Sequence, residues 1–402
     1  MSRPRHARQD SAADGRSGVL TSRLLDVDLD TFARDIWARR AHLTRTGHDF
    51  SDLFSAAAVD ELIAERGLRT PFLRIAKNGS TVSESRFTAP GGVGAEINDQ
   101  VDDTALWRQF AEGATIVLQA LHRTWAPVAD FTTQLAAELG HPVQANAYIT
   151  PPQNRGFDDH YDVHDVFVLQ VEGTKRWVIH EPVHPAPLRE QPWTDHREQV
   201  AEAARTEPII DTVLEPGDVL YLPRGWLHAA EAQGAVSIHL TLGVHVWTQY
   251  ALAEQLVRSA LDVLRDDPAM RASLALGVQG PDDQLAPIRD RLTQAIAEAD
   301  PTDTFHRVRR RQGRPAPLGP LAQLEALDQL VGDTPLRLRE GLAPRLVESR
   351  LETRVGWLDF ANEDLPRIRD LLAARVRTAD QLGLALAERL LRAGVLIPAP
   401  LV

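Results

Sequence analysis

The sequence predicts an α+β protein in which a central β-rich barrel or sandwich lies between helical segments. Short apolar runs separated by turn signals fill residues 142–247, which is typical of such a barrel or sandwich. Apolar residues at helical spacing occur before and after this region. A length of 402 residues with 43% hydrophobic residues allows one large core and one or two smaller units.

The segment before the β-rich region is expected to be a polar tail followed by helices. Residues 1–22 are polar and charged without periodicity, so we expect them to be disordered. Leu29, Phe32 and Ile36 lie at helical spacing and predict an amphipathic helix. Residues 115–139 are interpreted as two further helices around Ala126-Pro127. We assign residues 23–250 to one domain.

The strands expected in the β-rich region are the runs 163–171, 176–180, 218–222 and 236–246. After residue 250 the pattern becomes helical again. Two amphipathic faces follow, made of Leu252, Leu256, Ala260 and Leu264 and then of Leu285, Ile288, Leu292 and Ala295. Two such helices could pack on a symmetry mate, so we expect 251–330 to be a helical dimerisation region.

Residues 331–402 are expected to form a small separate module. The stretch 313–320, which contains Pro and Gly, is interpreted as a linker. Thr378 and Gln381 form a capping box for a helix that ends near Gly394, and a short strand follows at 395–397.

Composition excludes several kinds of site. The absence of cysteine excludes disulfides, thiolate zinc sites and iron–sulfur clusters, so any metal must be held by His and carboxylates. A net charge of -12 makes direct nucleic-acid binding an unfavourable interpretation and suits a basic protein partner. Without a long apolar stretch or an apolar signal region near the start, we expect a cytoplasmic protein that does not enter a membrane.

Three residues are candidate metal ligands. His160 and Asp162 are two positions apart, so on an extended strand both side chains leave the same face. His228 follows a turn, a short strand and a second turn, which suits a third ligand from a neighbouring strand. Two imidazoles and one carboxylate with open positions are typical of non-haem iron(II) oxygenases. No further catalytic side chain is expected.

Other histidines compete for these roles. His164 would lie on the same face as Asp162 if the strand stayed regular, so it is a rival ligand. His239 and His245 are interpreted as core or pocket-wall residues.

The co-substrate candidates begin with Lys175, one of only two lysines among 44 basic residues. A lysine in a chain so rich in Arg suggests a pocket that requires a compact ammonium, such as a carboxylate site. The hydroxyls of Tyr148 and Thr241 could hydrogen-bond the same carboxylate. Asn146, in the same run as Tyr148, is also a candidate.

These residues belong to a series of motifs. The series is Asn146-Ala-Tyr148-Ile-Thr-Pro, His160-Tyr-Asp162, Phe167-Val-Leu-Gln170, Gly173-Thr-Lys175-Arg-Trp177, Pro216-Gly-Asp218, and Pro223-Arg-Gly225 with His228. It resembles the JmjC-type ribosomal-protein hydroxylases. The resemblance implies a double-stranded β-helix (cupin/JmjC barrel) with N-terminal helices, a helical dimerisation region and a winged-helix-like C-terminal module. It also implies iron ligation by His160, Asp162 and His228, with Lys175, Tyr148 and Thr241 binding the distal carboxylate of 2-oxoglutarate.

The resemblance implies a dioxygenase that uses Fe(II), 2-oxoglutarate and O2 to hydroxylate an Arg or His side chain of a ribosomal protein, and that acts as a homodimer. Two alternatives use the same chemistry, namely hydroxylation of another peptide, including a natural-product precursor, and lysine demethylation. An alternative of another class is a non-enzymatic metal-binding cupin. Residues 153–159, which should line the substrate mouth, contain no pattern that identifies the target.

Overall fold

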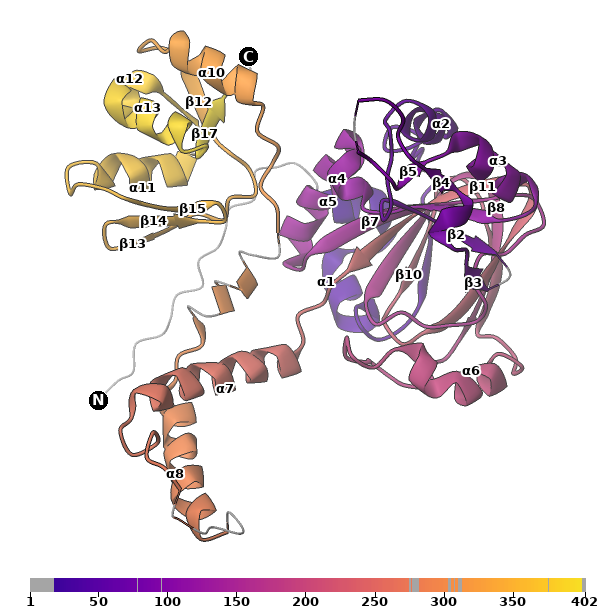
Figure 1. Cartoon of the computed structure of the whole chain (residues 1–402), viewed down its shortest axis with the longest axis horizontal. Coiled ribbons are helices and arrows are strands. Elements are labelled where there is room, and N and C mark those ends of the chain that lie inside the picture. The colour runs from indigo at the N-terminus through magenta and orange to yellow at the C-terminus, as the bar shows by residue number, and fades with distance from the viewer. Residues whose placement is uncertain are drawn as a thin grey trace. The chain divides into compact units, whose positions relative to one another are not determined.

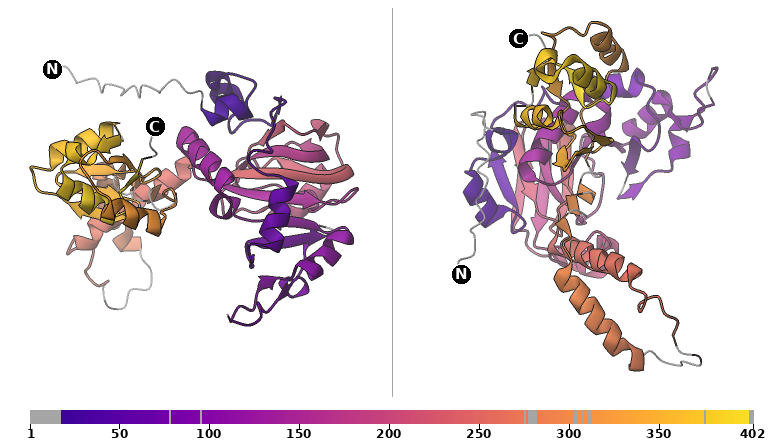
Figure 2. Two further views of the ribbon diagram at one scale, coloured as in Figure 1. Left: turned by 90° about the horizontal axis from the view of Figure 1, so that it is seen from above. Right: turned by 90° about the vertical axis from the view of Figure 1, so that its left-hand side faces the viewer.

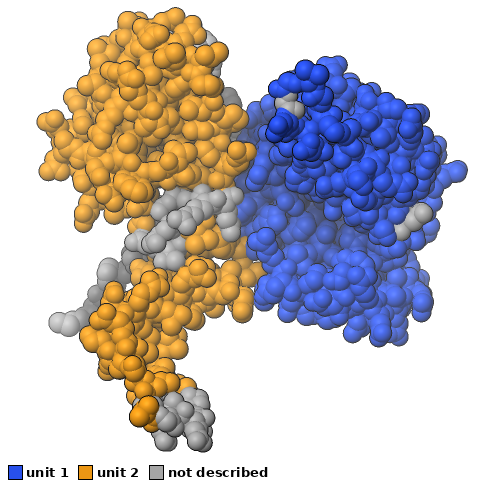
Figure 3. Space-filling model, viewed as in Figure 1, with its two compact units in different colours: residues 1–246 blue, residues 247–402 orange. Residues whose placement is uncertain are grey.

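The computed structural model describes residues 18–399, except 78, 95, 275, 277–281, 303, 304, 307, 310–312 and 375. The chain folds into two compact units, Met1–Val246 and Trp247–Val402 (Figure 3). Each unit is described by itself. Among the described residues, no helix combines the length and apolar character needed to span a membrane.

The first unit is built on a nine-stranded antiparallel sheet whose order is β1-β10-β8-β11-β7-β6-β2-β3, with β9 beside β8 (Figure 1). Its strands are β1 (His42–Arg45), β2 (Leu73–Lys77), β3 (Ser80–Thr81), β6 (Thr115–Leu118), β7 (Val143–Thr150), β8 (Asp165–His180), β9 (Ile210–Leu214), β10 (Asp218–Leu222) and β11 (Leu227–Val244). A two-stranded pair, β4 (Thr88–Ala89) and β5 (Gln100–Val101), lies apart from it. The predicted barrel is thereby confirmed.

The two longest strands, β8 and β11, pair along both of their halves and are interrupted at the same place. On β11 the register shifts between Gln233 and Ile238. On β8 the break falls at Gly173, where φ is +62° and a Cβ would collide with the Val236 carbonyl oxygen. A glycine is therefore required here. Beyond the break β8 changes its other neighbour from β10 to β9, so the sheet bends there.

Alternate residues of β8 serve different faces. Phe167 and Leu169 belong to the large core that also contains Phe32. Val166 and Val168 point to the opposite face and line a pocket. Residues 166–169 are all apolar because both faces of the strand are covered there.

Helical segments surround the sheet. They are η1 (Leu20–Leu24), α1 (Leu29–Thr31), η2 (Phe32–Ile36), α2 (Ala56–Ala64), η3 (Glu84–Arg86), α3 (Asp103–Ala111), α4 (Leu121–Thr124), α5 (Ala126–Leu139), η4 (Trp193–His196) and α6 (Arg197–Ala203). The helix expected around Leu29–Ile36 is present. The helix expected at the start of 115–139 is wrong: Thr115–Leu118 forms β6, because this β-branched run is buried on both faces between β2 and β7.

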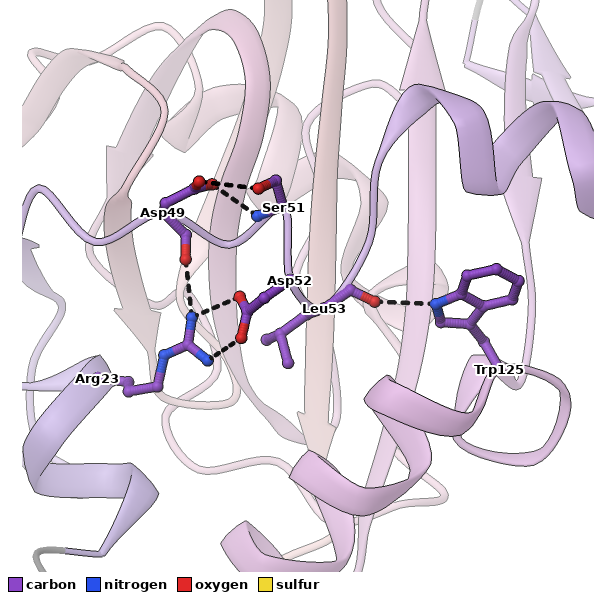
Figure 4. Close-up of polar contacts among 6 residues, drawn as sticks. All are labelled: Arg23, Asp49, Ser51, Asp52, Leu53 and Trp125. Atoms are coloured by element: carbon purple, nitrogen blue, oxygen red, sulfur yellow. Dashed lines mark hydrogen bonds and ion pairs between the residues drawn. The ribbon is translucent and has the colours of Figure 1, made fainter.

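The expectation of a disordered tail is wrong for residues 18–22. The carboxylate of Glu138 accepts hydrogen bonds from the amides of Val19 and Leu20 at 2.8 and 2.9 Å, so it caps the start of η1. Arg23 donates to both carboxylate oxygens of Asp52 at 2.7 and 2.8 Å and to the Asp49 carbonyl (Figure 4). These contacts fix the segment on the barrel. Residues 1–17 lie outside the described residues.

The second unit begins with α7 (Gln249–Asp266) and α8 (Asp282–Glu298), which pack on each other (Figure 2). Ala260, Leu264 and Ala295 form their buried seam. The remaining elements are α10 (Pro320–Asp328), β12 (Pro335–Leu338), β13 (Arg345–Val347), β14 (Arg350–Thr353), β15 (Gly356–Asp359), α11 (Leu365–Ala374), β16 (Val376–Thr378), α12 (Ala379–Leu382), α13 (Leu384–Arg392) and β17 (Leu396–Pro398).

The C-terminal elements form one small core with two three-stranded sheets, β16-β12-β17 and β13-β14-β15. The predicted boundary at residue 330 is too late, because α10 belongs to this module: Gln323 donates to the carbonyls of Leu391 and Leu396 at 2.8 and 2.7 Å. The capping box of Thr378 and Gln381 is confirmed. The helix that it starts is interrupted at Gly383, where φ is +85°.

Candidate metal centre

The three predicted metal ligands converge on one point. One donor atom each from His160, Asp162 and His228 lies within 4.8 Å of the others, and no other such group of His and carboxylates occurs among the described residues. The His228 Nε2 is 3.9 Å from an Asp162 carboxylate oxygen. The imidazole centroids are 4.4 Å apart. This spacing suits ligation of a single ion.

The ligands are positioned differently from the sequence expectation of a regular strand. His160 and Asp162 precede β8, which begins only at Asp165. His160 instead forms an isolated bridge with His228, in which their backbone amides and carbonyls exchange hydrogen bonds at 2.9 and 3.2 Å. This bridge holds the two imidazoles side by side at the end of the barrel.

Backbone carbonyls orient both imidazoles. The Nδ1 of His160 donates to the Asp158 carbonyl at 2.7 Å, and the Nδ1 of His228 donates to the Trp226 carbonyl at 3.0 Å. Because a carbonyl can only accept, each ring carries its proton on Nδ1. The Nε2 lone pairs remain for a metal, and such hydrogen bonds are usual for metal-binding histidines.

Charge and burial favour the ligating protonation states. Burial lowers the pKa of His228 to about 4, so this ring is neutral near pH 7. Burial alone would raise the pKa of Asp162, but the neighbouring His164 and His160 bring it below its ordinary value. A neutral imidazole and an ionised carboxylate are the forms that bind metals.

A buried carboxylate holds the turn that carries His228. Asp165 accepts hydrogen bonds from the Tyr221 hydroxyl at 2.6 Å and from the Arg224 amide at 3.0 Å. The next residue, Gly225, donates its amide to the carbonyl of Asp162 at 2.9 Å. The turn is therefore tied both to β8 and to a ligand. The Tyr221 hydroxyl also accepts from the Ala38 amide at 2.9 Å, which connects the N-terminal segment to this network.

A pocket extends from the ligands into the barrel. Its lining consists of Thr115, Tyr148, Gly156, Phe157, His160, Asp162, Val166, Val168, Lys175, Trp177, His228, Ala230, His239 and Thr241. It thus contains all three ligand candidates together with Lys175, Tyr148 and Thr241, which the sequence proposed for the co-substrate.

Lys175 is a buried cation. Only 3% of its surface is exposed, and within the described chain no carboxylate forms an ion pair with it. Its Nζ donates to the Thr150 hydroxyl at 3.0 Å, and Thr150 in turn accepts from Thr115 at 3.2 Å. Burial lowers the pKa of Lys175 to about 7. An ammonium in this position requires an anionic partner.

The predicted role of Asn146 does not fit its position. Asn146 does not line the pocket, and its side-chain oxygen accepts the Ala120 amide at 3.0 Å. It therefore supports the turn before α4. His164 is not part of the ligand group either, because its ring stacks on His245 at 5.3 Å.

His239, predicted to be a core or pocket-wall residue, lines the pocket two positions before Thr241 on β11, which confirms that prediction. The period of a strand places both side chains on one face. Sequence reasoning missed Arg74, which lies beside the pocket-lining Phe157. Arg74 comes from β2, far away in the sequence, and no local signal indicates it. Its guanidinium lies 5.2 Å from the centre of the Phe157 ring, and its buried Nε has no partner within the described chain.

Comparisons with known proteins agree with this fold. A family model of the JmjC domain matches residues 122–252. The chain is 32% identical over 276 residues to the bifunctional lysine-specific demethylase and histidyl-hydroxylase NO66 of Drosophila melanogaster, covering 66% of this chain and 40% of that protein. It is 31% identical over 219 residues to human ribosomal oxygenase 1, covering 54% and 32%.

Two solved structures share the fold. The Escherichia coli ribosomal oxygenase YcfD, solved with cobalt and 2-oxoglutarate, has a TM-score of 0.56 at 20% identity and covers 93% of this chain and 99% of that one. Another structure of the same protein gives 0.58 at 19% identity, with the same two coverages. The chain spans only 24% to 40% of the length of the curated relatives. Residues 122–252 are thus similar to JmjC domains, and the fold is similar to that of a ribosomal oxygenase.

Proposed function

We propose that this protein is an iron(II)- and 2-oxoglutarate-dependent oxygenase that hydroxylates a ribosomal protein. The observation that carries the proposal is the combination of a His160–Asp162–His228 centre with the buried, unpaired cation Lys175 in one pocket. A metal site alone would suit many proteins. The cation adds the requirement for an anion inside the same pocket.

The residues fit iron(II). Two imidazoles and one carboxylate leave positions open for exogenous ligands, which is the set used by non-haem iron(II) oxygenases. Structural zinc sites usually have four protein ligands, and the described residues provide three.

The pocket also fits 2-oxoglutarate. One carboxylate of this dianion would pair with Lys175, with the Thr150 and Thr115 hydroxyls beside it. The apolar side chains of Val166, Val168 and others would exclude water around it. When bound, iron with 2-oxoglutarate and O2 supplies the oxidising power that places oxygen on a C–H bond. The chain's own residues bind and orient, and none of them needs to transfer a proton.

Arg74 favours a neutral acceptor side chain. Its charge acts on both Asp162 and Tyr148, so it lies close to the reacting region. The charges of iron(II), the 2-oxoglutarate dianion, Asp162 and Lys175 cancel, which leaves the positive charge of Arg74. A cationic Arg or methyl-lysine would be repelled, whereas a neutral imidazole would not. We therefore favour His over Arg as the acceptor and hydroxylation over demethylation.

The ribosomal substrate is supported by the names of the relatives and by charge. Ribosomal oxygenases are among both the sequence relatives and the structural neighbours. The net charge of -12 would attract a basic protein. With such a substrate we also propose a cytoplasmic location, where ribosomes translate.

We further propose that α7 and α8 mediate dimerisation and that the C-terminal module is winged-helix-like. Support for a dimer comes from apolar side chains of α7 that remain exposed, including Leu261 at 51% and Val263 at 61%. Support for a winged-helix-like module comes from its three main helices, which pack with the two small sheets.

Co-substrate binding tests the function before the substrate is known. Cobalt(II)-loaded protein should bind 2-oxoglutarate in a calorimetric titration, and Lys175→Met should weaken this binding roughly 100-fold, as expected for the loss of a buried charged pair. Glutarate, which lacks the 2-oxo group, serves as a control and should bind more weakly. Wild-type protein that binds cobalt but not 2-oxoglutarate would contradict the proposal and favour the non-enzymatic cupin.

A further inference from the structure

His239 is a buried polar residue that does not belong to the group of candidate metal ligands. It lies on β11, lines the pocket and is only 2% exposed. Its Nδ1 is buried and has no hydrogen-bond partner in the described chain. A buried polar atom without a partner costs free energy, so it requires an explanation.

The imidazole of His239 is held in one orientation. It stacks on Tyr148 with ring centroids 4.9 Å apart and an interplanar angle of 2°. On another side the ring of Trp177 meets it edge-on at 5.5 Å and 79°. Both neighbours also line the pocket. An imidazole fixed in this way is preorganised for a ligand, because binding need not order it.

The surroundings of His239 are rich in donors and poor in acceptors. Burial and, secondarily, the charge of Lys175 place the pKa of His239 well below 6.5, so the ring is neutral and has one N–H. The indole N–H of Trp177 also has no partner among the described residues. The single carboxylate of the pocket lining is Asp162, which is already a ligand candidate. Such an excess of donors over acceptors indicates an anion site.

We propose that His239 is a further co-substrate residue, whose ring N–H donates a hydrogen bond to the carboxylate that Lys175 binds. The identity of that carboxylate as the distal end of 2-oxoglutarate rests on the proposed function. In this arrangement Tyr148 and Trp177 position the imidazole, and Lys175 supplies the charge. The alternative is that His239 only packs between aromatic rings, in which case a phenylalanine would serve equally well.

Substitutions separate these two roles. His239→Phe keeps an aromatic ring for stacking and removes the N–H, whereas His239→Asn and His239→Gln place an amide donor near the positions of Nδ1 and Nε2. Cobalt(II)-loaded variants are titrated with 2-oxoglutarate and with succinate. We expect His239→Phe to weaken both dissociation constants roughly 10-fold to 100-fold, as for the loss of a hydrogen bond to a charged group. One of the amide variants should recover part of that loss.

His245→Phe is the matched control, because the His245 ring also stacks on another ring, that of His164, but does not line the pocket. It should bind 2-oxoglutarate like the wild type. Cobalt(II) affinity should be unchanged in His239→Phe. Equal 2-oxoglutarate affinity in His239→Phe and wild type would overturn this inference alone, whereas failure of the wild type to bind would overturn the proposed function together with it.

A second measurement follows the imidazole of the wild-type protein itself. In protein labelled with ¹⁵N-histidine, with the His239 resonances identified by their loss in His239→Gln, addition of succinate should shift the His239 ring nitrogens. The ring should remain neutral. Ring nitrogens that do not shift at saturating succinate would overturn the inference.

Discussion

At the scale of single residues, the centre depends on where each imidazole carries its proton. His160 and His228 both donate Nδ1–H to carbonyls of their own chain, two residues upstream. The two rings therefore present Nε2 before any metal arrives. This preorganisation distinguishes them from His164, which lies only two positions after Asp162 but stacks on His245.

We therefore expect His160→Ala to lower cobalt(II) affinity at least 100-fold and His164→Ala to change it less than threefold. The first variant removes a ligand, whereas the second removes a ring outside the ligand group. Titration of the visible absorption of cobalt(II) measures both affinities. A His164→Ala variant that lost cobalt as completely as His160→Ala would show that four side chains bind the metal.

Lys175 makes co-substrate binding depend on pH. Its pKa of about 7 lies far below the ordinary value for lysine because of burial, so the ammonium loses its proton as the pH rises through 7. A bound carboxylate stabilises the charged form. Affinity for 2-oxoglutarate should therefore fall up to 10-fold per pH unit above 7, and binding near pH 8 should take up a proton.

Calorimetric titrations at pH 6, 7 and 8 in two buffers of different ionisation enthalpy measure both effects. Lys175→Met should lose the proton uptake. Affinity that is constant from pH 6 to 8, without proton uptake, would mean that Lys175 is charged throughout and that this prediction is wrong.

The residues that could be predicted from the sequence were those with a local signal. His160 and Asp162 are two positions apart, and His228 follows two turns. Lys175 is one of only two lysines in a chain rich in Arg. Asn146 was misassigned because a motif does not indicate which side chain faces the pocket. Arg74 was missed because the pairing of β2 with β6 brings it to the site across a long separation in sequence.

At the scale of elements, the turn between β10 and β11 determines where His228 lies. Asp165 holds this turn from within the barrel and is fully buried. The same carboxylate accepts a hydrogen bond from the Tyr221 hydroxyl. That hydroxyl accepts from the Ala38 amide, which connects the turn to the N-terminal segment. The element is therefore rigid because one buried acceptor satisfies donors from two segments.

Asp165→Asn should lower the free energy of unfolding by about 2–4 kcal/mol, since the amide cannot accept all of these hydrogen bonds and leaves donors unpaired. Urea denaturation followed by circular dichroism measures the change. Asp211→Asn is the matched control, because Asp211 forms an exposed ion pair with Arg176 and should matter little. Equal effects of the two substitutions would contradict the role given to Asp165.

Periodicity predicted the presence and type of several elements more accurately than their first and last residues. The strand at 218–222 and the helices around 252–264 and 285–295 are present. The run at 115–118 was misread because so short a run, with three apolar residues, fits a helix or a strand, and only its burial between two strands decides. The break of β8 at Gly173 depends on the close approach of β11, which no local pattern reveals.

At the scale of the whole molecule, the order of a barrel region followed by helices and a small module was predictable from the change in periodicity. The boundary of the module was not. Gln323 binds carbonyls of Leu391 and Leu396, about 70 positions later, so α10 joins the module through tertiary contacts.

The proposed dimer is tested by charge placed on α7. Val257 and Leu261 are 40% and 51% exposed and lie four residues apart on one face of the helix. The double variant Val257→Glu/Leu261→Glu should be monomeric in light scattering coupled to size exclusion, whereas the wild type should be dimeric. Trp107→Glu, at an exposed aromatic residue of α3, is the control and should remain dimeric. A monomeric wild type would contradict the proposal.

The most direct test of the proposed activity combines the metal, the co-substrate and the substrate in one reaction. The purified protein is incubated with iron(II), ascorbate, 2-oxoglutarate and ribosomal proteins, with the Asp162→Ala variant in parallel. The account predicts succinate and a mass gain of one oxygen on a peptide, located on a His residue, with neither product from the variant. An oxygen located on an Arg residue of the substrate would refute only the argument from Arg74 and would leave the proposed activity standing. Absence of both products, in protein that binds iron, would contradict the central claim.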